Sequence, residues 1–267
     1  MTSDTLKPWE ILAKVRDRQP LVHHLTNWVT IYDCAQVVKV LGASPVMAHA
    51  REEVAQMTGL ASSLVLNIGT LTPDFVDAML LAAHAANARG IPVILDVCGA
   101  GATPLRDESS FRLMTEAIID IVKGNASEIA RVSGAQVQTK GVDATEVKLN
   151  LREMAQSLAR RRQSVVVVTG AEDIVAGPVK LFLVRNGHPL MGRVVGTGCM
   201  ATSLIGAFAA VEPDLVVAAA AALVCFGVAA EIAAQNASGP ASFKEKLFDA
   251  LFLLDEATLR EKIKVGT

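Results

Sequence analysis

Short apolar runs alternate along the chain with segments whose apolar residues recur every three or four positions. The first pattern predicts β-strands and the second predicts amphipathic helices. The expected strands are Leu21–His24, Leu64–Asn67, Val93–Asp96, Ile118–Val122 and Ser164–Thr169. The expected helices are Asp33–Leu41, Pro73–Arg89, Ser127–Val132 and Val147–Arg160. This alternation indicates a mostly parallel sheet with crossover helices.

The pattern changes after Thr169, the last residue of the fifth expected strand. Asp173–Ala176 and Leu181–Arg185 predict a hairpin, and from Gly196 the chain is almost wholly helical to near its end. We find no linker, no low-complexity segment and no internal repeat. The sequence therefore predicts an α/β fold in a single domain, residues 1–267.

Composition points to a large buried core, because 51 % of the residues are apolar and only 19 % are charged. The apolar surplus also favours surface buried between subunits. The stretch Leu215–Ala230 carries no charge, but it is short for a membrane span and rich in alanine, so we expect a buried helix. A net charge of −2 and the lack of a basic stripe give no support for nucleic-acid binding.

The cysteines are scattered, with no spacing typical of a disulfide framework or a zinc site. Met1 to Lys7 is polar and lacks the apolar core of a signal peptide. Both features favour a reducing compartment, and we expect a cytoplasmic protein without a membrane partner. The four cysteines are Cys34, Cys98, Cys199 and Cys225.

Polar residues and glycines follow the five expected parallel strands. Ligands of parallel sheets bind beyond the carboxyl ends of the strands, so five such coincidences favour a ligand site over ordinary turns. The residues are Thr26 and Asn27; Asn67, Gly69 and Thr70; Asp96 with Gly99-Ala100-Gly101; Lys123-Gly124-Asn125; and Thr169-Gly170.

The strongest local signal is the turn Gly196-Thr197-Gly198-Cys199, which is followed by the helical run Ala201–Val211. Glycines let the backbone approach an anion closely, and the free amides and dipole of a helix start attract negative charge. Such a turn suits the charge on a transferring phosphoryl group. The alternative is a tight turn in which the glycines serve steric needs alone, and the turn by itself leaves both open.

Several neighbouring side chains have two interpretations each. Cys199 is either a thiolate favoured by the helix start or a small buried hydrophobe. Asp96 and Glu128 are candidate magnesium contacts, but Glu128 also fits as the capping-box partner of an N-cap Asn125. Lys123 either reaches a nucleotide phosphate or lies on the surface.

Seven segments, in this order, resemble hydroxyethylthiazole kinases of the ribokinase-like superfamily. The match covers almost the whole chain, and cysteine at the end of the glycine-rich turn is specific, because most ribokinase-like enzymes are expected to carry aspartate there. The segments are Val22-His23-His24-Leu25-Thr26-Asn27, Leu41-Gly42-Ala43-Ser44-Pro45-Val46-Met47, Leu66-Asn67-Ile68-Gly69-Thr70-Leu71, Leu95-Asp96 with Gly99-Ala100-Gly101-Ala102-Thr103, Gly124-Asn125-Ala126-Ser127-Glu128, Val167-Val168-Thr169-Gly170, and Gly187-His188-Pro189-Leu190-Met191 with Gly196-Thr197-Gly198-Cys199.

The resemblance implies a three-layer α/β/α fold without a separate lid domain. It implies that ATP and 4-methyl-5-(2-hydroxyethyl)thiazole give ADP and the thiazole phosphate in thiamine salvage. It further implies Mg²⁺ as the metal and a homotrimer whose active sites lie at subunit boundaries.

Site residues carry over by position. The resemblance implies that the thiazole contacts Asn27, Met47, Gly69 and Gly196. The nucleotide would contact Lys123, Asn125 and Thr169, and Asp96 and Glu128 would act on Mg²⁺ directly or through water. The catalytic anion hole would be Gly196, Thr197, Gly198 and Cys199, with Cys199 nearest the substrate hydroxyl.

Two positions depart from the family pattern. The family's usual Leu-Asp-Pro-Val-Gly reads here Leu-Asp-Val97-Cys98-Gly, and Lys123 stands where the family usually has arginine. Loss of the proline frees a backbone angle, and lysine lacks the bidentate fork of arginine. Two rival hypotheses remain: a related kinase of another small alcohol, and a non-catalytic sensor of thiazole or nucleotide.

Overall fold

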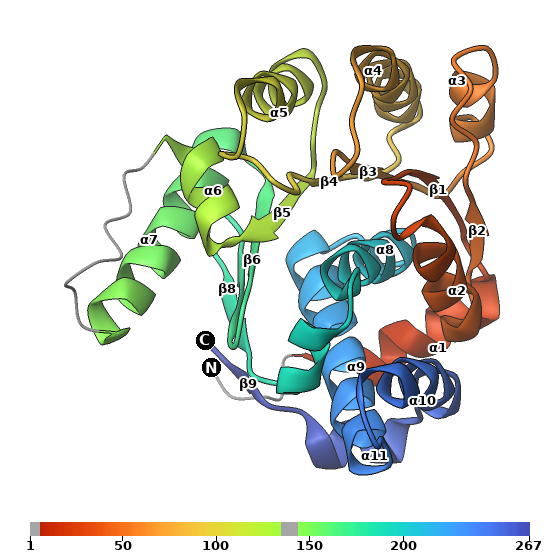
Figure 1. Cartoon of the computed structure of the whole chain (residues 1–267), viewed down its shortest axis with the longest axis vertical. Helices are drawn as coiled ribbons and strands as arrows, with labels where there is room; N and C mark the ends of the chain where they lie inside the picture. Colours follow the sequence, from red (N-terminus) through yellow and green to blue (C-terminus); the bar gives the residue numbers. More distant parts are fainter. Residues whose placement is uncertain (1–5, 135–143) are drawn as a thin grey trace.

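The computed structural model describes residues 6–134 and 144–267, and within them one nine-stranded sheet forms the centre of the molecule (Figure 1). The strands lie in the order β2-β1-β3-β4-β5-β6-β7-β8-β9. Neighbours from β2 to β6 pair in parallel and those from β6 to β9 pair antiparallel, so the sheet is mostly parallel, as predicted. The strands are β1 Leu21–Leu25, β2 Ser44–Val46, β3 Ser63–Asn67, β4 Val93–Asp96, β5 Ile121–Asn125, β6 Val165–Thr169, β7 Asp173–Ala176, β8 Leu181–Val184 and β9 Val265–Gly266.

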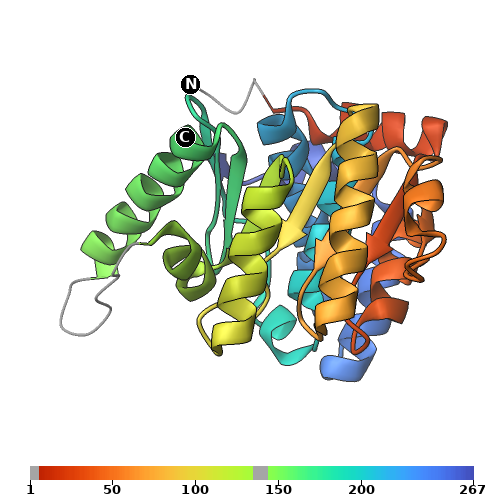
Figure 2. The ribbon, with the colours of Figure 1, turned by 90° about the horizontal axis from the view of Figure 1, so that it is seen from above.

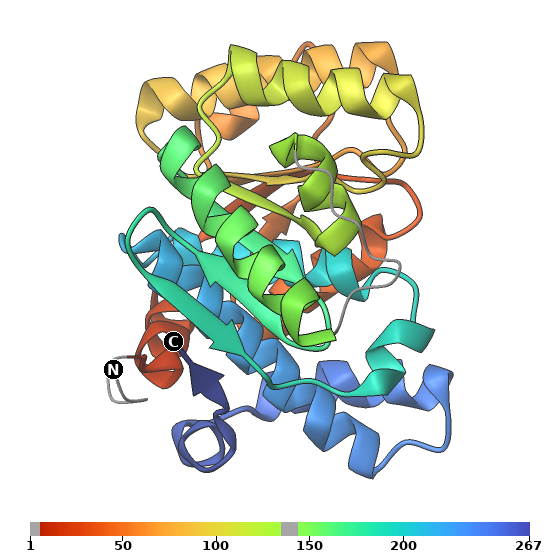
Figure 3. The same cartoon turned by 90° about the vertical axis from the view of Figure 1, so that its left-hand side faces the viewer.

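Helices cover both faces of the sheet and complete three layers (Figures 1 and 3). Helices α3 to α5 lie over one face, with α4 and α5 side by side (Figure 2), and α2, α8, α9 and α10 lie over the other. Among the described residues no separate lid domain is present. The helices are α1 Pro8–Arg18, α2 Ile31–Leu41, α3 Val54–Thr58, α4 Pro73–Arg89, α5 Pro104–Glu116, α6 Ala126–Ser133, α7 Ala144–Arg162, the 3₁₀ helix η2 Pro189–Arg193, α8 Thr197–Ala209, α9 Leu215–Gln235, α10 Pro240–Leu253 and α11 Glu256–Lys262.

Successive residues of the central strands enter two different cores, because side chains alternate across a strand. Val65 packs into the core that contains α8 and α9, whereas Leu64 and Leu66 pack into the core that contains α4. On β6, Val165 and Val167 likewise pack into the first of these cores, and Val166 and Val168 pack into the second. The continuous apolar runs of the sequence are therefore explained by a sheet covered on both faces.

The apolar stretch that begins at Leu215 forms α9, which is buried in the core. It is the one helix of the described residues that is long and apolar enough to cross a membrane, and most of its apolar window is buried inside the protein. It packs against α8, α10 and the sheet. The expectation of a buried helix is confirmed.

The fourth expected strand, Ile118–Val122, was placed three residues too early. β5 begins at Ile121, while Ile118 is 67 % exposed and hydrogen-bonds through its backbone to the side chain of Asn87. The shift brings Lys123, Gly124 and Asn125 into the strand, where the sequence pattern had placed them after it. These residues therefore have positions fixed by the sheet register.

Several short or polar elements escaped the sequence pattern altogether. They are α1, β2, α3, α5 and β9. α5 had a readable start, since Thr103 caps it by accepting a hydrogen bond from the Arg106 N–H and Pro104 occupies its first turn. Its low apolar content hid the helical period.

Candidate active site

The sheet register brings three polar side chains into one row at the carboxyl edge. Asn67 at the end of β3 pairs with Asp96 at the end of β4, and Asp96 pairs with Lys123 of β5. Asn125, at the end of β5, pairs with Thr169 at the end of β6. Parallel strands thus gather at one edge the residues that the sequence placed there.

Lys123 and Asp96 form a buried ion pair, with 3.1 Å between Nζ and Oδ2. The Thr202 hydroxyl donates to the same Oδ2 at 2.6 Å. Burial lowers the pKa of Lys123, but the charge and hydrogen bond of Asp96 outweigh it and leave that pKa raised. The surface-lysine alternative is wrong, because only 4 % of Lys123 is exposed.

The ammonium group of Lys123 also reaches the glycine-rich turn. A Cβ atom placed on Gly198 would lie 3.2 Å from Lys123 Nζ, so the charge lies directly against the start of α8. A fixed cation and a helix N-terminus therefore act at the same point, and both favour an anion there.

The turn itself forms the first residues of α8. The helix begins at Thr197, so the sequence-based start at Ala201 was too late. Gly196 is the N-cap at φ 92°, and a Cβ there would come within 2.5 Å of Thr30 Cγ2. The steric interpretation of this glycine is thus correct, but glycine also has no side chain to cap the helix, and the first amides of α8 are left for a ligand.

Cys199 accepts hydrogen bonds from two side-chain amides. Asn27 Nδ2 and Asn67 Nδ2 each lie 3.3 Å from its Sγ. A hydrogen bond from the Cys98 thiol lowers the pKa of Cys199 to about 6, although burial opposes the shift; Lys123 also lowers it. The same hydrogen bond, together with burial, raises the pKa of Cys98. The Cys199 sulfur thus has polar partners, which a cysteine packed only among apolar side chains would lack.

Glu128 and Asn125 make the capping box that the sequence offered as an alternative. Asn125 Oδ1 accepts from the Glu128 N–H at 3.0 Å, and Glu128 Oε2 accepts from the Asn125 N–H at 2.7 Å. Glu128 Oε1 accepts from the Gly99 N–H at 2.7 Å, which ties α6 to the loop after β4. Each carboxylate oxygen retains a second lone pair, so this structural role leaves room for a water-mediated cation.

A cavity of about 550 Å³ opens beside the start of α8. Thr169, from the nucleotide set of the sequence analysis, lines it together with Thr197 and Gly198. His188 and Phe226 contribute to other walls. Lys123 lies behind Gly198, and Asn125 is exposed next to Thr169. Of the three expected nucleotide residues, Thr169 alone lines this cavity, while Lys123 and Asn125 neighbour its lining residues Gly198 and Thr169.

Gly69 lies in the same cluster as Asn27 and Asn67. Its N–H donates to Asn67 Oδ1 at 2.9 Å, and a Cβ at this position would lie 3.0 Å from Asn27 Cβ. Met47 follows β2 and is half-buried, with its carbonyl oxygen accepting from His49. Within the described part of the chain, no hydrogen bond joins Met47 to this cluster.

Three side chains of the site were missed from the sequence. Thr202 lies three positions after Cys199 on α8, and helical spacing could have indicated it. Thr30 donates its backbone N–H and its hydroxyl to Asn27 Oδ1. The Arg106 guanidinium donates to the carbonyl oxygens of Ile68, Gly69 and Cys98 and so joins the loops after β3 and β4. Nothing local to Arg106 reveals this role.

A metal ion was expected between Asp96 and Glu128. Among the side chains of residues 6–134 and 151–267, no group of three or more His, Cys, Asp or Glu could form a protein cage for a metal. Asp96 Oδ1, however, is buried and lacks a hydrogen-bond partner. An unpaired carboxylate oxygen at a phosphate site fits Mg²⁺, which keeps most of its own waters and needs few protein ligands.

A sequence model described as the hydroxyethylthiazole kinase family matches residues 12–257 of this chain. The chain belongs to the hydroxyethylthiazole kinase family. The expected family and the kinase class are thereby confirmed.

Relatives of this family match over nearly their full length. The chain is 52 % identical to hydroxyethylthiazole kinase of Methanosarcina mazei, over 95 % of this chain and 97 % of that protein. It is 50 % identical to hydroxyethylthiazole kinase of Desulforudis audaxviator, over 95 % and 93 %. The hydroxyethylthiazole kinase structure of Pyrococcus horikoshii superposes with a TM-score of 0.90 at 41 % identity, over 97 % and 98 %.

A more distant structure shares the fold alone. A ribokinase-like superfamily protein of Enterococcus faecalis superposes with a TM-score of 0.65 at 13 % identity, over 94 % of this chain and 90 % of that chain. The ribokinase-like α/β/α fold expected from the sequence is confirmed.

The two departures from the hydroxyethylthiazole kinase pattern both lie in the site. Cys98, where the family usually has valine, hydrogen-bonds Cys199. Lys123, where the family usually has arginine, pairs with Asp96 through a single 3.1 Å contact. Val97, in place of proline, donates its N–H to the Lys123 carbonyl at 2.9 Å, a bond that proline could not make.

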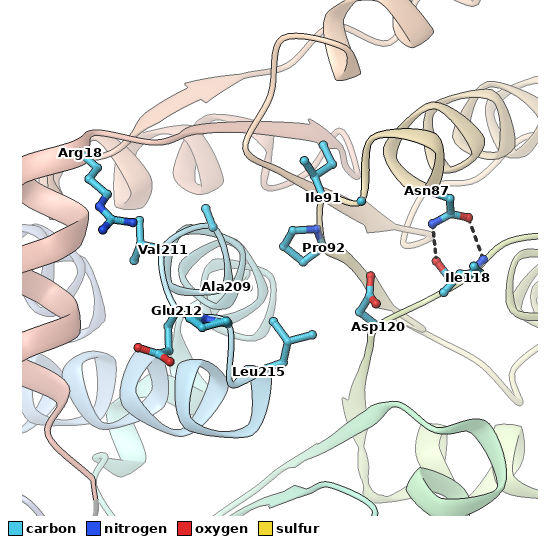
Figure 4. A pocket seen from close by; sticks show the side chains of 13 residues that line it. Arg18, Asn87, Ile91, Pro92, Ile118, Asp120, Ala209, Val211, Glu212 and Leu215 are labelled. Carbon is cyan, nitrogen blue, oxygen red and sulfur yellow. Dashed lines mark hydrogen bonds between the residues drawn. The ribbon is translucent and has the colours of Figure 1, made fainter.

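A second cavity, of about 580 Å³, lies at the opposite edge of the sheet (Figure 4). Pro92 and Asp120, which precede β4 and β5, line it with Arg18 and Glu212. It contains none of the residues that the family resemblance assigns to substrate or nucleotide. The two cavities have similar volumes, and they differ in the residues that line them.

Proposed function

We propose that this chain transfers the γ-phosphoryl group of ATP to the hydroxyl of 4-methyl-5-(2-hydroxyethyl)thiazole, giving ADP and the thiazole phosphate, a reaction of thiamine salvage. The observation that carries the proposal is the start of α8, where Gly196 leaves the first amides uncapped and Lys123 adds a buried positive charge. These groups stabilise the negative charge on the phosphoryl group during its transfer, which is the main requirement of this chemistry.

The thiazole occupies the side of the site formed by Asn27, Met47, Gly69 and Gly196 in this proposal. Cys199, at the same turn, accepts the proton of the substrate hydroxyl as the new O–P bond forms. Its depressed pKa supports this role, because a thiolate is able to accept a proton at neutral pH. The amides of Thr197, Gly198 and Cys199 hold the phosphoryl oxygens.

The nucleotide occupies the cavity lined by Thr169, and its phosphates point toward Gly198 and Lys123 in this proposal. Asn125 contacts it from the end of β5. Asp96 and Glu128 hold Mg²⁺ directly or through water, and Asp96 Oδ1 is the oxygen free to do so. The ion would neutralise charge on the ATP phosphates.

A homotrimer with active sites at subunit boundaries forms part of the proposal. Trp28, Val29 and Tyr32 follow Asn27 and are exposed by 49 %, 67 % and 72 %. Exposed aromatic and apolar side chains next to a substrate residue are typical of a surface that a partner covers. The four cysteines are all free thiols, which supports the cytoplasm as the location.

An ADP-release assay with Mg²⁺-ATP and a panel of alcohols tests this function. We expect hydroxyethylthiazole to give the highest kcat/KM among thiazole, pyrimidine and sugar alcohols. A much higher value for another alcohol would favour the related-kinase hypothesis. Tight thiazole binding by calorimetry without any phosphorylated product would favour the sensor hypothesis.

A further inference from the structure

Two buried asparagine amides have orientations that hydrogen-bonding partners fix. The Gly69 N–H can only donate, so the Asn67 atom 2.9 Å from it must be the carbonyl oxygen. The Thr30 N–H donates to Asn27 across 3.1 Å, so the Asn27 atom that it meets must likewise be the carbonyl oxygen Oδ1. The NH₂ group of each side chain must therefore point the other way.

Both NH₂ groups point to the sulfur of Cys199. Asn27 Nδ2 lies 3.3 Å from Sγ and also donates to Asn67 Oδ1 at 3.1 Å, while Asn67 Nδ2 lies 3.3 Å from Sγ. Asn27 is 4 % exposed and Asn67 is 1 % exposed, so water does not compete for these bonds. The sulfur thus faces two donors, an arrangement that favours a sulfur atom acting as acceptor.

Asn67 differs from Asn27 in its place in the site. Asn27 belongs to the thiazole set, whereas nothing so far gives Asn67 a role in the reaction. Asn67 lies at the end of β3, where it pairs with Asp96 of β4 on one side and hydrogen-bonds Asn27 on the other. Its two ends serve two parts of the site: Oδ1 holds Gly69 and Asn27, and Nδ2 holds Cys199.

We infer that Asn67 is a positioning residue that orients the sulfur of Cys199 as a proton acceptor and, through its carbonyl end, holds Asn27 and Gly69 in place. The inference rests on the proposed phosphoryl transfer to the thiazole hydroxyl. Asn67 acts through its hydrogen bond to the Cys199 sulfur, and the proton passes to that sulfur and not to Asn67.

The variant Asn67→Asp separates the two ends of this side chain. The carboxylate keeps the acceptor for Gly69 and Asn27 but replaces the donor to Cys199 with an oxygen that repels a thiolate. We expect kcat to fall about tenfold while KM for the thiazole changes less than about twofold. Asn67→Ala loses both ends and should also raise KM. Asn236→Asp, an exposed position at the end of α9, controls for the added charge.

A double-mutant cycle with Cys199→Ala tests whether Asn67 acts through the sulfur. If it does, Asn67→Asp costs about tenfold in kcat in the wild-type background and less than about twofold in the Cys199→Ala background. An equal loss in both backgrounds would overturn the inference, because it would show a general structural role.

A second measurement needs no kinase activity. We expect iodoacetamide to alkylate Cys199 several-fold more slowly in Asn67→Asp, and in the milder Asn67→Ser, than in the wild type at neutral pH, with the modified residue identified by mass spectrometry. An unchanged rate in folded variants would overturn the inference. A wild-type protein that never phosphorylates the thiazole, but whose Cys199 shows this dependence on Asn67, would overturn only the proposed function.

Discussion

The two edges of the sheet carry cavities of similar size, yet the same helix gives them opposite electrostatic character. α8 directs its first amides into the cavity at the carboxyl edge, and its last residues, Ala209 among them, line the cavity at the amino edge. A helix attracts anions at its start and repels them at its end. Asp120 and Glu212 add two acidic side chains at the amino edge, where Arg18 is the one basic side chain lining the cavity. Helix direction and buried charge, rather than cavity volume, support the carboxyl edge as the proposed phosphoryl site.

The strongest test of this comparison replaces one aspartate at each edge of the sheet with asparagine. Asp96→Asn should lower kcat about 1,000-fold, because it removes a charge beside the transferring group and leaves Lys123 without its counterion. Asp120→Asn is the matched control and should change kcat less than twofold, since Asp120 lines the cavity at the amino edge, away from the start of α8. The ADP-release assay measures both.

Stability and activity must be separated for Asp96→Asn. Loss of one partner of a buried ion pair costs about 3–5 kcal/mol, so we expect a lower melting temperature with native secondary structure by circular dichroism. Near wild-type turnover in this variant would mean that the metal assignment is wrong.

Replacements of one basic side chain at each edge form the next comparison. Lys123→Met should lower kcat/KM for ATP about 100-fold, because it removes the cation against Gly198. Arg18→Met removes a cation from the amino-edge cavity and should leave kcat/KM for ATP within about twofold of wild type. Equal effects of the two replacements would contradict the account.

Cys199→Ser should lower kcat only about tenfold, because the backbone amides of α8 carry most of the stabilisation and dissociative phosphoryl transfer needs little base catalysis. Steady-state kinetics with saturating thiazole and ATP measures this effect. A complete loss of activity would instead point to an essential thiolate.

Cys98→Val restores the residue that the family usually carries and should have the smallest effect. The hydrogen bond from Cys98 is the main cause of the low pKa of Cys199, about 6, so the thiolate predominates at pH 7 and is lost as the pH falls through 6. Without this bond the pKa rises, and at pH 7 alkylation of Cys199 should slow about threefold. A pH profile of the alkylation rate in both proteins measures the shift.

The elements predicted best from the sequence carry complete local signals. Pro73–Arg89 matches α4 at both ends because Thr72 caps its start and Gly90 adopts a left-handed conformation at its end. Asp173–Ala176 matches β7 because its apolar run is bounded by turn residues, which is also a complete local signal. β5 was misplaced because the apolar residue Ile118 precedes the strand and lies on the surface.

The candidate site was only partly accessible from the sequence. Asp96, Lys123 and Asn67 could be assigned to one edge because parallel strands align their carboxyl ends. The 3.1 Å contact between Lys123 and Asp96, and the two amides directed at Cys199, depend on side-chain positions that no local pattern encodes. Arg106 was missed because two of its three carbonyl partners, Ile68 and Gly69, lie in a loop distant from it in sequence.

The most direct test of the central claim is a crystal structure of the chain with the thiazole and a non-hydrolysable ATP analogue. We expect the γ-phosphate to lie within hydrogen-bonding distance of the amides of Thr197, Gly198 and Cys199, with the thiazole hydroxyl beside the Cys199 sulfur. Phosphates bound away from the start of α8, or a nucleotide in the cavity beside Asp120, would contradict the account.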